Sequence, residues 1–167
     1  MTPSIARVCA TAAGLVLGFG LQGCRDTDRL ASAPGAAARR TITPHVIVAP
    51  DGASAVLTLA LDVHGDVGRI GSFTGRLRFD ATQLAYDGEV PLTDGTMRAS
   101  NPGEGVIRIA GASLSGVDVA QLASFRFKVI NAAGLSAVQF DIEEVHELSR
   151  ANVTALVVRS GATGTRR

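Results

Sequence analysis

Apolar residues recur at every second position in many short segments of this chain, and the pattern is best developed over residues 71–90. In an extended chain, Phe73, Leu77 and Phe79 point to one side and the polar residues between them point to the other. Asp80 ends the alternation, and a short Asp side chain accepts hydrogen bonds from backbone N–H groups one to three residues further on. The segment therefore predicts a strand, a corner at Asp80 and a second strand that returns to the core.

The same alternation predicts an all-β domain in the rest of the chain. Many of the 19 glycines lie between the alternating segments, as is typical of turns. The segments expected as strands are 45–49, 55–63, 70–80, 83–90, 96–100, 105–112, 124–130, 137–143 and 153–158. Short, half-buried strands at this spacing favour a sandwich of two antiparallel sheets.

Composition limits what the chain can do. The 167 residues favour one domain, and a net charge of +1 provides no general attraction to nucleic acid. The two cysteines, Cys9 and Cys24, both lie near the N-terminus, so the predicted sandwich has no disulfide and must be stabilised by apolar burial.

The first 23 residues are typical of a bacterial signal peptide. Arg7 precedes an uncharged run over residues 8–21, which is shorter than the roughly 20 residues that a membrane-spanning helix needs. The run ends at Leu21-Gln22-Gly23-Cys24, which resembles the lipobox of bacterial lipoproteins, although Gln22 is a less usual residue there. The resemblance implies that a diacylglycerol is attached to the Cys24 sulfur, that the chain is cleaved before Cys24, and that the new amino group is acylated.

Two other interpretations of this region remain open. One is ordinary secretion with cleavage after Ala31-Ser32-Ala33, which Pro34 disfavours, and the other is a retained anchor in which Cys24 is incidental. Arg25 follows the cysteine, and in the diderm lipoproteins that the chain resembles this residue implies sorting to the outer membrane. We therefore expect a lipid-anchored protein of the cell envelope.

The expected order of segments is a signal-peptide helix over 1–23, a tether over 24–43, the sandwich over 44–158 and a disordered tail over 159–167. The tether is expected to be flexible because it has no apolar period, and a short helix over 36–40 is the alternative.

With the strands placed, the chain resembles bacterial cohesin domains over residues 44–158. The segments that carry the resemblance are 73–80 with Leu84 and Val90, 105–110, and 122–129. The first is similar to the family's L-x-Y-D-P-x-x-L element, with Phe79 at the usual Tyr position and Ala81 at the usual Pro position. Cohesins are nine-stranded jelly-roll sandwiches that bind dockerin modules through one sheet, so the resemblance implies this fold and non-catalytic protein binding. Related carbohydrate-binding modules share much of the pattern.

The cohesin strand order also implies a candidate binding face. In that order, the segments around Arg76, Arg98, Arg108 and Arg126 belong to one sheet. The basic residues expected on its outer face are Arg76, Arg78, Arg98, Arg108, Arg126 and Lys128. Asp62, Asp141 and Glu143 are expected on the opposite sheet. A basic face of this kind would steer an acidic partner, whereas the alternative is that long charged side chains only cover the sheet and keep it soluble.

Other sites are less well supported by the sequence. Asp62, His64 and Asp66, at alternate positions, are favoured as a polar strand end rather than a metal site. The 143–147 segment is favoured as an exposed edge or loop. No nucleophile elbow, metalloprotease or phosphate-loop motif is present, so we expect no enzyme activity and no cofactor.

Three binding functions remain open. The first is binding of a dockerin-like or other envelope protein. The second is carbohydrate binding, for which a single tyrosine and the absence of tryptophan leave few exposed rings, unless the basic face binds an anionic polysaccharide. The third is a structural lipoprotein of a secretion or pilus assembly.

Overall fold

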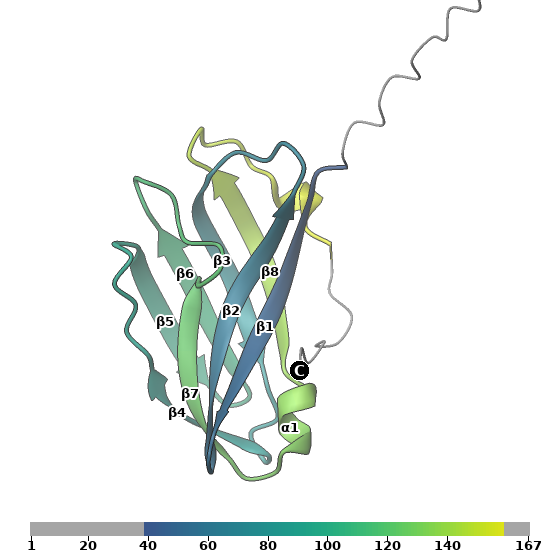
Figure 1. The fold of residues 1–167 in the computed structure, drawn as a ribbon, viewed down its shortest axis with the longest axis vertical. Helices are drawn as coiled ribbons and strands as arrows, with labels where there is room; N and C mark the ends of the chain where they lie inside the picture. Colours follow the sequence, from purple (N-terminus) through teal and green to yellow (C-terminus); the bar gives the residue numbers. More distant parts are fainter. Residues whose placement is uncertain (1–38, 159–167) are drawn as a thin grey trace, which may run out of the picture. The chain divides into compact units, whose positions relative to one another are not determined.

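Two four-stranded antiparallel sheets pack face to face (Figure 1). The computed structural model describes residues 39–158, so the leader, Cys24, most of the expected tether and the tail after residue 158 lie outside the described residues. The β1 sheet contains, in spatial order, β1 (Thr41–Asp51), β2 (Ser54–His64), β7 (Ala123–Val129) and β4 (Leu84–Glu89). The β3 sheet contains β5 (Met97–Gly103), β6 (Val106–Ala112), β3 (Ile70–Arg78) and β8 (Gln139–Glu147). The predicted β-sandwich is therefore confirmed.

The sandwich has eight strands in residues 39–158, and the prediction of a ninth strand over residues 153–158 is wrong. In its place the chain forms a single 3-10 turn, η1 (Thr154–Leu156), and then one isolated parallel bridge between Val157 and Ile42. The Val158 N–H donates to the Ile42 carbonyl over 2.8 Å. The next step of a parallel ladder would need an N–H from residue 44, which is a proline and has none. The ladder therefore ends after one bridge.

Other boundaries also differ from those expected. β1 begins at Thr41, three residues before the expected domain boundary, because it pairs with β2 along its whole length. β5 continues through Pro102 to Gly103, where a turn was expected. Proline is tolerated there because β5 is an edge strand. A single helical turn, α1 (Ala133–Ser136), links β7 to β8 where only a turn was expected. None of the helices in residues 39–158 is long and apolar enough to cross a bilayer.

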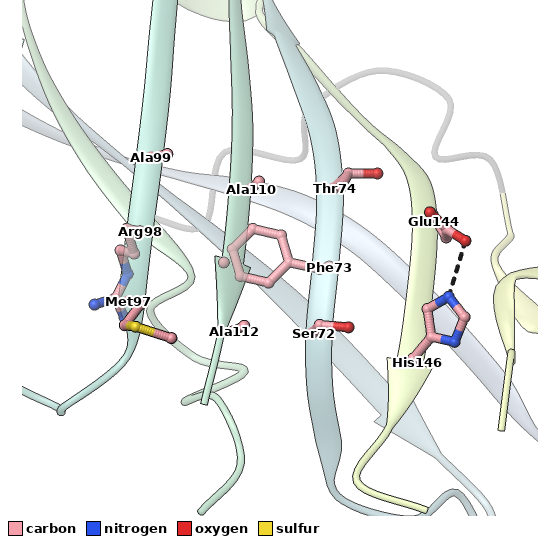
Figure 2. A pocket seen from close by; sticks show the side chains of 11 residues that line it. Ser72, Phe73, Thr74, Met97, Arg98, Ala99, Ala110, Ala112, Glu144 and His146 are labelled. Carbon is pink, nitrogen blue, oxygen red and sulfur yellow. Dashed lines mark hydrogen bonds and ion pairs between the residues drawn. The ribbon is translucent and has the colours of Figure 1, made fainter. Parts of the chain in front are cut away.

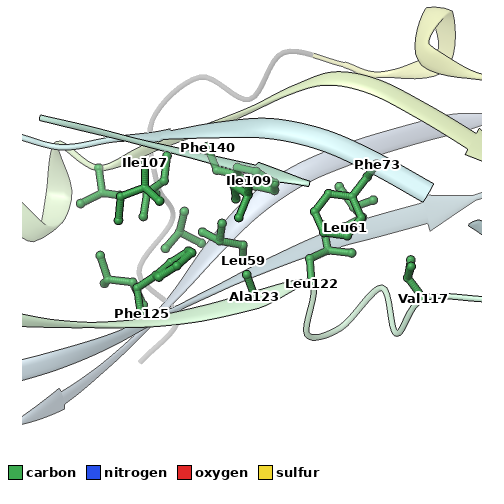
Figure 3. Packing of buried hydrophobic residues seen from close by; sticks show 14 of the residues in the cluster. Leu59, Leu61, Phe73, Ile107, Ile109, Val117, Leu122, Ala123, Phe125 and Phe140 are labelled. Carbon is green, nitrogen blue, oxygen red and sulfur yellow. The ribbon is translucent and has the colours of Figure 1, made fainter. Parts of the chain in front are cut away.

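The core lies between the sheets and comes mostly from side chains that the alternation assigned inward (Figure 3). Ile42, which was expected in the tether, and Val145, in the segment expected to be exposed, are also fully buried in it. Leu57 and Leu59 of β2, together with Phe125 and Phe127 of β7, are fully buried. Burying each such side chain contributes about 1.5–3 kcal/mol. The alternation therefore located the inner faces of these strands correctly.

The corner at Asp80 forms as expected. Its carboxylate accepts hydrogen bonds from the Thr82 hydroxyl at 2.6 Å, the Thr82 N–H at 2.9 Å and the Gln83 side-chain amide at 2.6 Å. These bonds lower the pKa of Asp80, and the bond from the Thr82 hydroxyl has the largest effect. The corner carries the chain from β3 in one sheet to β4 in the other, where Leu84 is fully buried and Tyr86 packs against the core.

Candidate binding surface

The six basic residues expected on one face are divided between the two sheets. Arg76 and Arg78 lie on β3 and Arg108 lies on β6, so these three belong to the β3 sheet. Arg126 and Lys128 lie on β7, which pairs with β2 and β4 in the β1 sheet. The prediction of a single basic face is therefore wrong. Alternation correctly assigned these side chains outward, but it does not determine to which sheet β7 belongs.

Arg98 was expected to point outward, and this prediction is also wrong. Arg98 pairs with Gly111 of β6, and Gly111 in turn pairs with the buried Phe73 of β3. The side chain of Arg98 therefore points to the same inner side of the sheet as that of Phe73. Its guanidinium binds both carboxylate oxygens of Asp94, at 2.7 and 2.6 Å, and its Nε donates to the Leu122 carbonyl at 2.6 Å. The side chain is only 9% exposed. Arg98 therefore links the two sheets at the β5 edge and is not available to a partner.

Asp94 is held in its charged form by this arrangement. The hydrogen bonds from Arg98 lower the pKa of the Asp94 carboxyl strongly, and further bonds from the Thr96 hydroxyl and N–H act in the same direction. The ion pair is thus one of the best-satisfied charge pairs in the described part of the chain, and its role is structural.

Two of the three arginines on the outer face of the β3 sheet are paired with carboxylates of β8. Arg76 pairs with Glu143, and the Arg78 Nη1 lies 3.3 Å from the Asp141 carboxylate. Asp141 and Glu143 were expected on the opposite sheet, and this is wrong because β8 pairs directly with β3. The arginine charge on this face is therefore largely balanced by its own neighbours.

A bulge in β8 adds to this acidic edge. Thr74 lies opposite Glu144 whereas Gly75 lies opposite Ile142, so Glu143 has no partner across the strand pair. The extra residue lets Glu143 and Glu144 both be exposed, although they are consecutive. The strand expected from the sequence ended at residue 143, so both the bulge and the continuation of β8 to Glu147 were missed.

Arg108 has a different environment from Arg76 and Arg78. It is exposed and has no ion pair with any residue in the 39–158 range that the structure describes. Directly across the strand pair lies Arg76, and like charges in that position repel. The Arg76 Nε is also buried without a hydrogen-bond partner among the described residues. Within residues 39–158, Arg108 is thus a cation without an ion pair beside Arg76, whose guanidinium pairs with Glu143 but leaves its Nε without a hydrogen bond.

Two residues after Arg108 on β6, Ala110 lines an apolar hollow in the outer face of the β3 sheet. Figure 2 shows the side chains that line it. The hollow, of about 350 Å³, crosses the four strands of this sheet near one end, over the first half of β3 and β5 and the last half of β6 and β8. The residues of β3, β5 and β6 that line it with outward-facing side chains are Ser72, Thr74, Met97, Ala99, Ala110 and Ala112. The hollow exists because alanine side chains end at Cβ. Met97, which is 73% exposed, lies at one side of it.

Glu144 and His146 on β8 form the opposite side of the hollow. Figure 2 shows their side chains joined by a hydrogen bond of 2.9 Å between Nε2 and Oε1. This bond raises the pKa of His146. The hollow therefore has an apolar side on β5 and a charged side on β8.

The aromatic residues in the described part of the chain belong to the core. Phe73, Phe125, Phe127 and Phe140 are at most 5% exposed, and Phe79 and Tyr86 pack against them. No aromatic side chain in residues 39–158 is among the exposed large hydrophobic ones. Phe73 lines the hollow but is only 2% exposed, so it offers almost no ring surface on which a sugar could stack.

Neither of the two metal sites considered from sequence, at residues 62–66 and 143–147, brings enough ligands together. Within the described residues, no three His, Cys, Asp or Glu side chains come together in an arrangement that could hold a metal ion. Asp62 instead lies 3.6 Å from His45 on the neighbouring strand β1. The hollow itself could have been found from the sequence through the small outward residues of β6, but only once β5 was paired beside it.

Comparisons with known proteins identify the fold. No family profile and no curated protein sequence matches the chain. Among solved structures, it is similar to a non-cellulosomal cohesin from the archaeon Archaeoglobus fulgidus, with 17% identity, a TM-score of 0.53, and 72% of this chain and 85% of that one covered.

Two further solved structures agree. One is the sixth cohesin of Acetivibrio cellulolyticus scaffoldin B in complex with a dockerin, with 15% identity, a TM-score of 0.51, and coverage of 76% and 99%. The other is the cohesin module of a Clostridium perfringens family 33 glycoside hydrolase, with 13% identity, a TM-score of 0.51, and coverage of 67% and 89%. The expected cohesin-like fold is confirmed.

Proposed function

We propose that this cohesin-like chain is a non-catalytic module that binds a protein partner through the outer face of its β3 sheet. The observation that carries the proposal is the hollow beside the unpaired Arg108, on a face that nothing in residues 39–158 covers. A matched cohesin in complex with a dockerin supports a protein as the partner.

The physical character of the face suits protein binding. Small side chains at Ala99, Ala110 and Ala112 let a partner's side chain approach the sheet closely, and the exposed Met97 provides an adaptable apolar contact. The strands below are held by a buried core, so the surface is formed before binding and little conformational entropy is lost.

Site-specific photo-crosslinking in the source cells tests this function. The full chain carries a photoreactive residue in place of Ala110 on β6 or, as the matched control, in place of Ala49, an exposed alanine of β1 in the other sheet. We expect discrete, protease-sensitive adducts from position 110 and none from position 49. Equal adducts from both positions would contradict the proposal, and adducts removed by glycosidases instead of proteases would indicate a polysaccharide partner.

We further propose that the module is held at the cell envelope by lipid on Cys24. The lipobox-like Leu21–Cys24 segment supports this, and two or more acyl chains at ~0.8 kcal/mol per buried methylene provide a stable anchor. Mass spectrometry of the purified chain should find Cys24 as the acylated first residue, and the Cys24→Ser variant should remain unprocessed. A mature N-terminus at Pro34 would instead indicate ordinary secretion.

A further inference from the structure

We infer that the partner presents a carboxylate next to an apolar side chain, with the carboxylate on Arg108 and the apolar side chain in the hollow. This inference rests on the proposed binding role of the β3-sheet face and specifies the chemistry that the face would recognise. It follows from the charges around Arg108, from the position of the hollow, and from the carboxylate at the hollow's far side.

The charges favour an acidic group at Arg108. Arg76 and Arg78 are paired with Glu143 and Asp141, whereas Arg108 has no carboxylate partner among the described residues and lies opposite Arg76. A carboxylate from another protein would supply the missing partner and reduce the repulsion between the two arginines. The planar, two-pronged guanidinium matches a carboxylate with two parallel hydrogen bonds.

The position of the hollow favours an apolar neighbour for that carboxylate. Ala110 and Arg108 are two residues apart on β6, so both side chains point outward about 7 Å from each other. A leucine- or isoleucine-sized side chain above Ala110 would cover the alanines and the exposed Met97 and remove apolar surface from water.

The direction of the pair is also determined. Glu144 lies on the β8 side of the hollow, bonded to His146, and would repel a second carboxylate there. The partner's acidic residue must therefore lie on the Arg108 side. A separation of about 7 Å corresponds to two residues in an extended segment or about four in a helix.

Selection from a random dodecapeptide library on the immobilised full chain tests this inference. The baits are wild type, Arg108→Glu, Ala110→Trp to fill the hollow, and Met97→Glu as a second block at its side. The matched control is Arg126→Glu, a charge reversal on the other sheet. Each variant is first shown to unfold cooperatively, as the wild type does.

We expect wild-type peptides to be enriched in Asp or Glu within four positions of Leu, Ile or Met. Their affinity should fall about tenfold or more on Arg108→Glu, stay unchanged on Arg126→Glu, and return on Arg108→Glu when the peptide's acidic residue is replaced by lysine. If the selected peptides lose binding on Ala110→Trp or Met97→Glu but are not enriched in acidic residues, the inference is overturned and the proposed function stands. Peptides unaffected by both blocking variants would overturn both.

Discussion

Arg98 and Arg108 are the same residue type on neighbouring strands of one sheet, but their environments give them opposite roles. Arg98 points inward, is 9% exposed and binds Asp94 and the carbonyl of Leu122. Arg108 points outward and is exposed. The difference of one position in the strand pleat therefore decides whether an arginine stabilises the fold or is available to a partner.

We expect Arg98→Ala to lower the free energy of unfolding by roughly 2–3 kcal/mol, because it leaves the Leu122 carbonyl and the Asp94 carboxylate without their charged donor. Arg98→Lys should recover only part of this, since an ammonium cannot bind both carboxylate oxygens in parallel. Urea denaturation measures the change, and Arg108→Ala, at an exposed position, should stay within about 0.5 kcal/mol of wild type.

The pH dependence of stability provides a control for the role of the Arg98–Asp94 ion pair. Because the pKa of Asp94 is lower in the folded state than in the unfolded state, the pair stabilises the fold above about pH 4 and the contribution is lost as the pH falls toward the folded pKa. Asp94→Asn should therefore be less stable than wild type at neutral pH, with the difference shrinking in acid. A constant difference across this range would contradict the assignment.

At the scale of strands, the sequence was sufficient wherever a local rule decided the structure. The period of two identified the buried residues of β2 and β7, and the Asp80 side chain predicted the corner between β3 and β4. Both depend on residues adjacent in sequence, so neither requires knowledge of the tertiary fold.

The failures at this scale have a common physical cause, which is pairing between distant segments. Whether β7 pairs with β2 or with β6 depends on how whole strands align. The alternating pattern is compatible with both pairings, because Phe125 and Phe127 would point into the core in either sheet. The bulge at Glu143 and the early end of the C-terminal ladder at Pro44 likewise depend on the neighbouring strand. The candidate site inherited these errors, so only Arg76, Arg78 and Arg108 remain on its face.

For residues 39–158 as a whole, the sandwich presents two outer faces of different character. The β3 sheet carries a hollow between an exposed Met97 and the Glu144–His146 pair, with Arg108 beside it. The β1 sheet carries Arg126 and Lys128, and the Lys128 ammonium lies 3.7 Å from the Asp87 carboxylate. A shared core supports both faces, so a substitution on one should leave the other intact.

Cross-saturation NMR on the labelled full chain, bound to the protein captured through position 110, tests the choice of face most directly. We expect signal loss at the amides of Thr74, Ala99 and Ala110, which surround the hollow. Signal loss confined to Thr58 and Arg126, on the β1 sheet, would contradict the account.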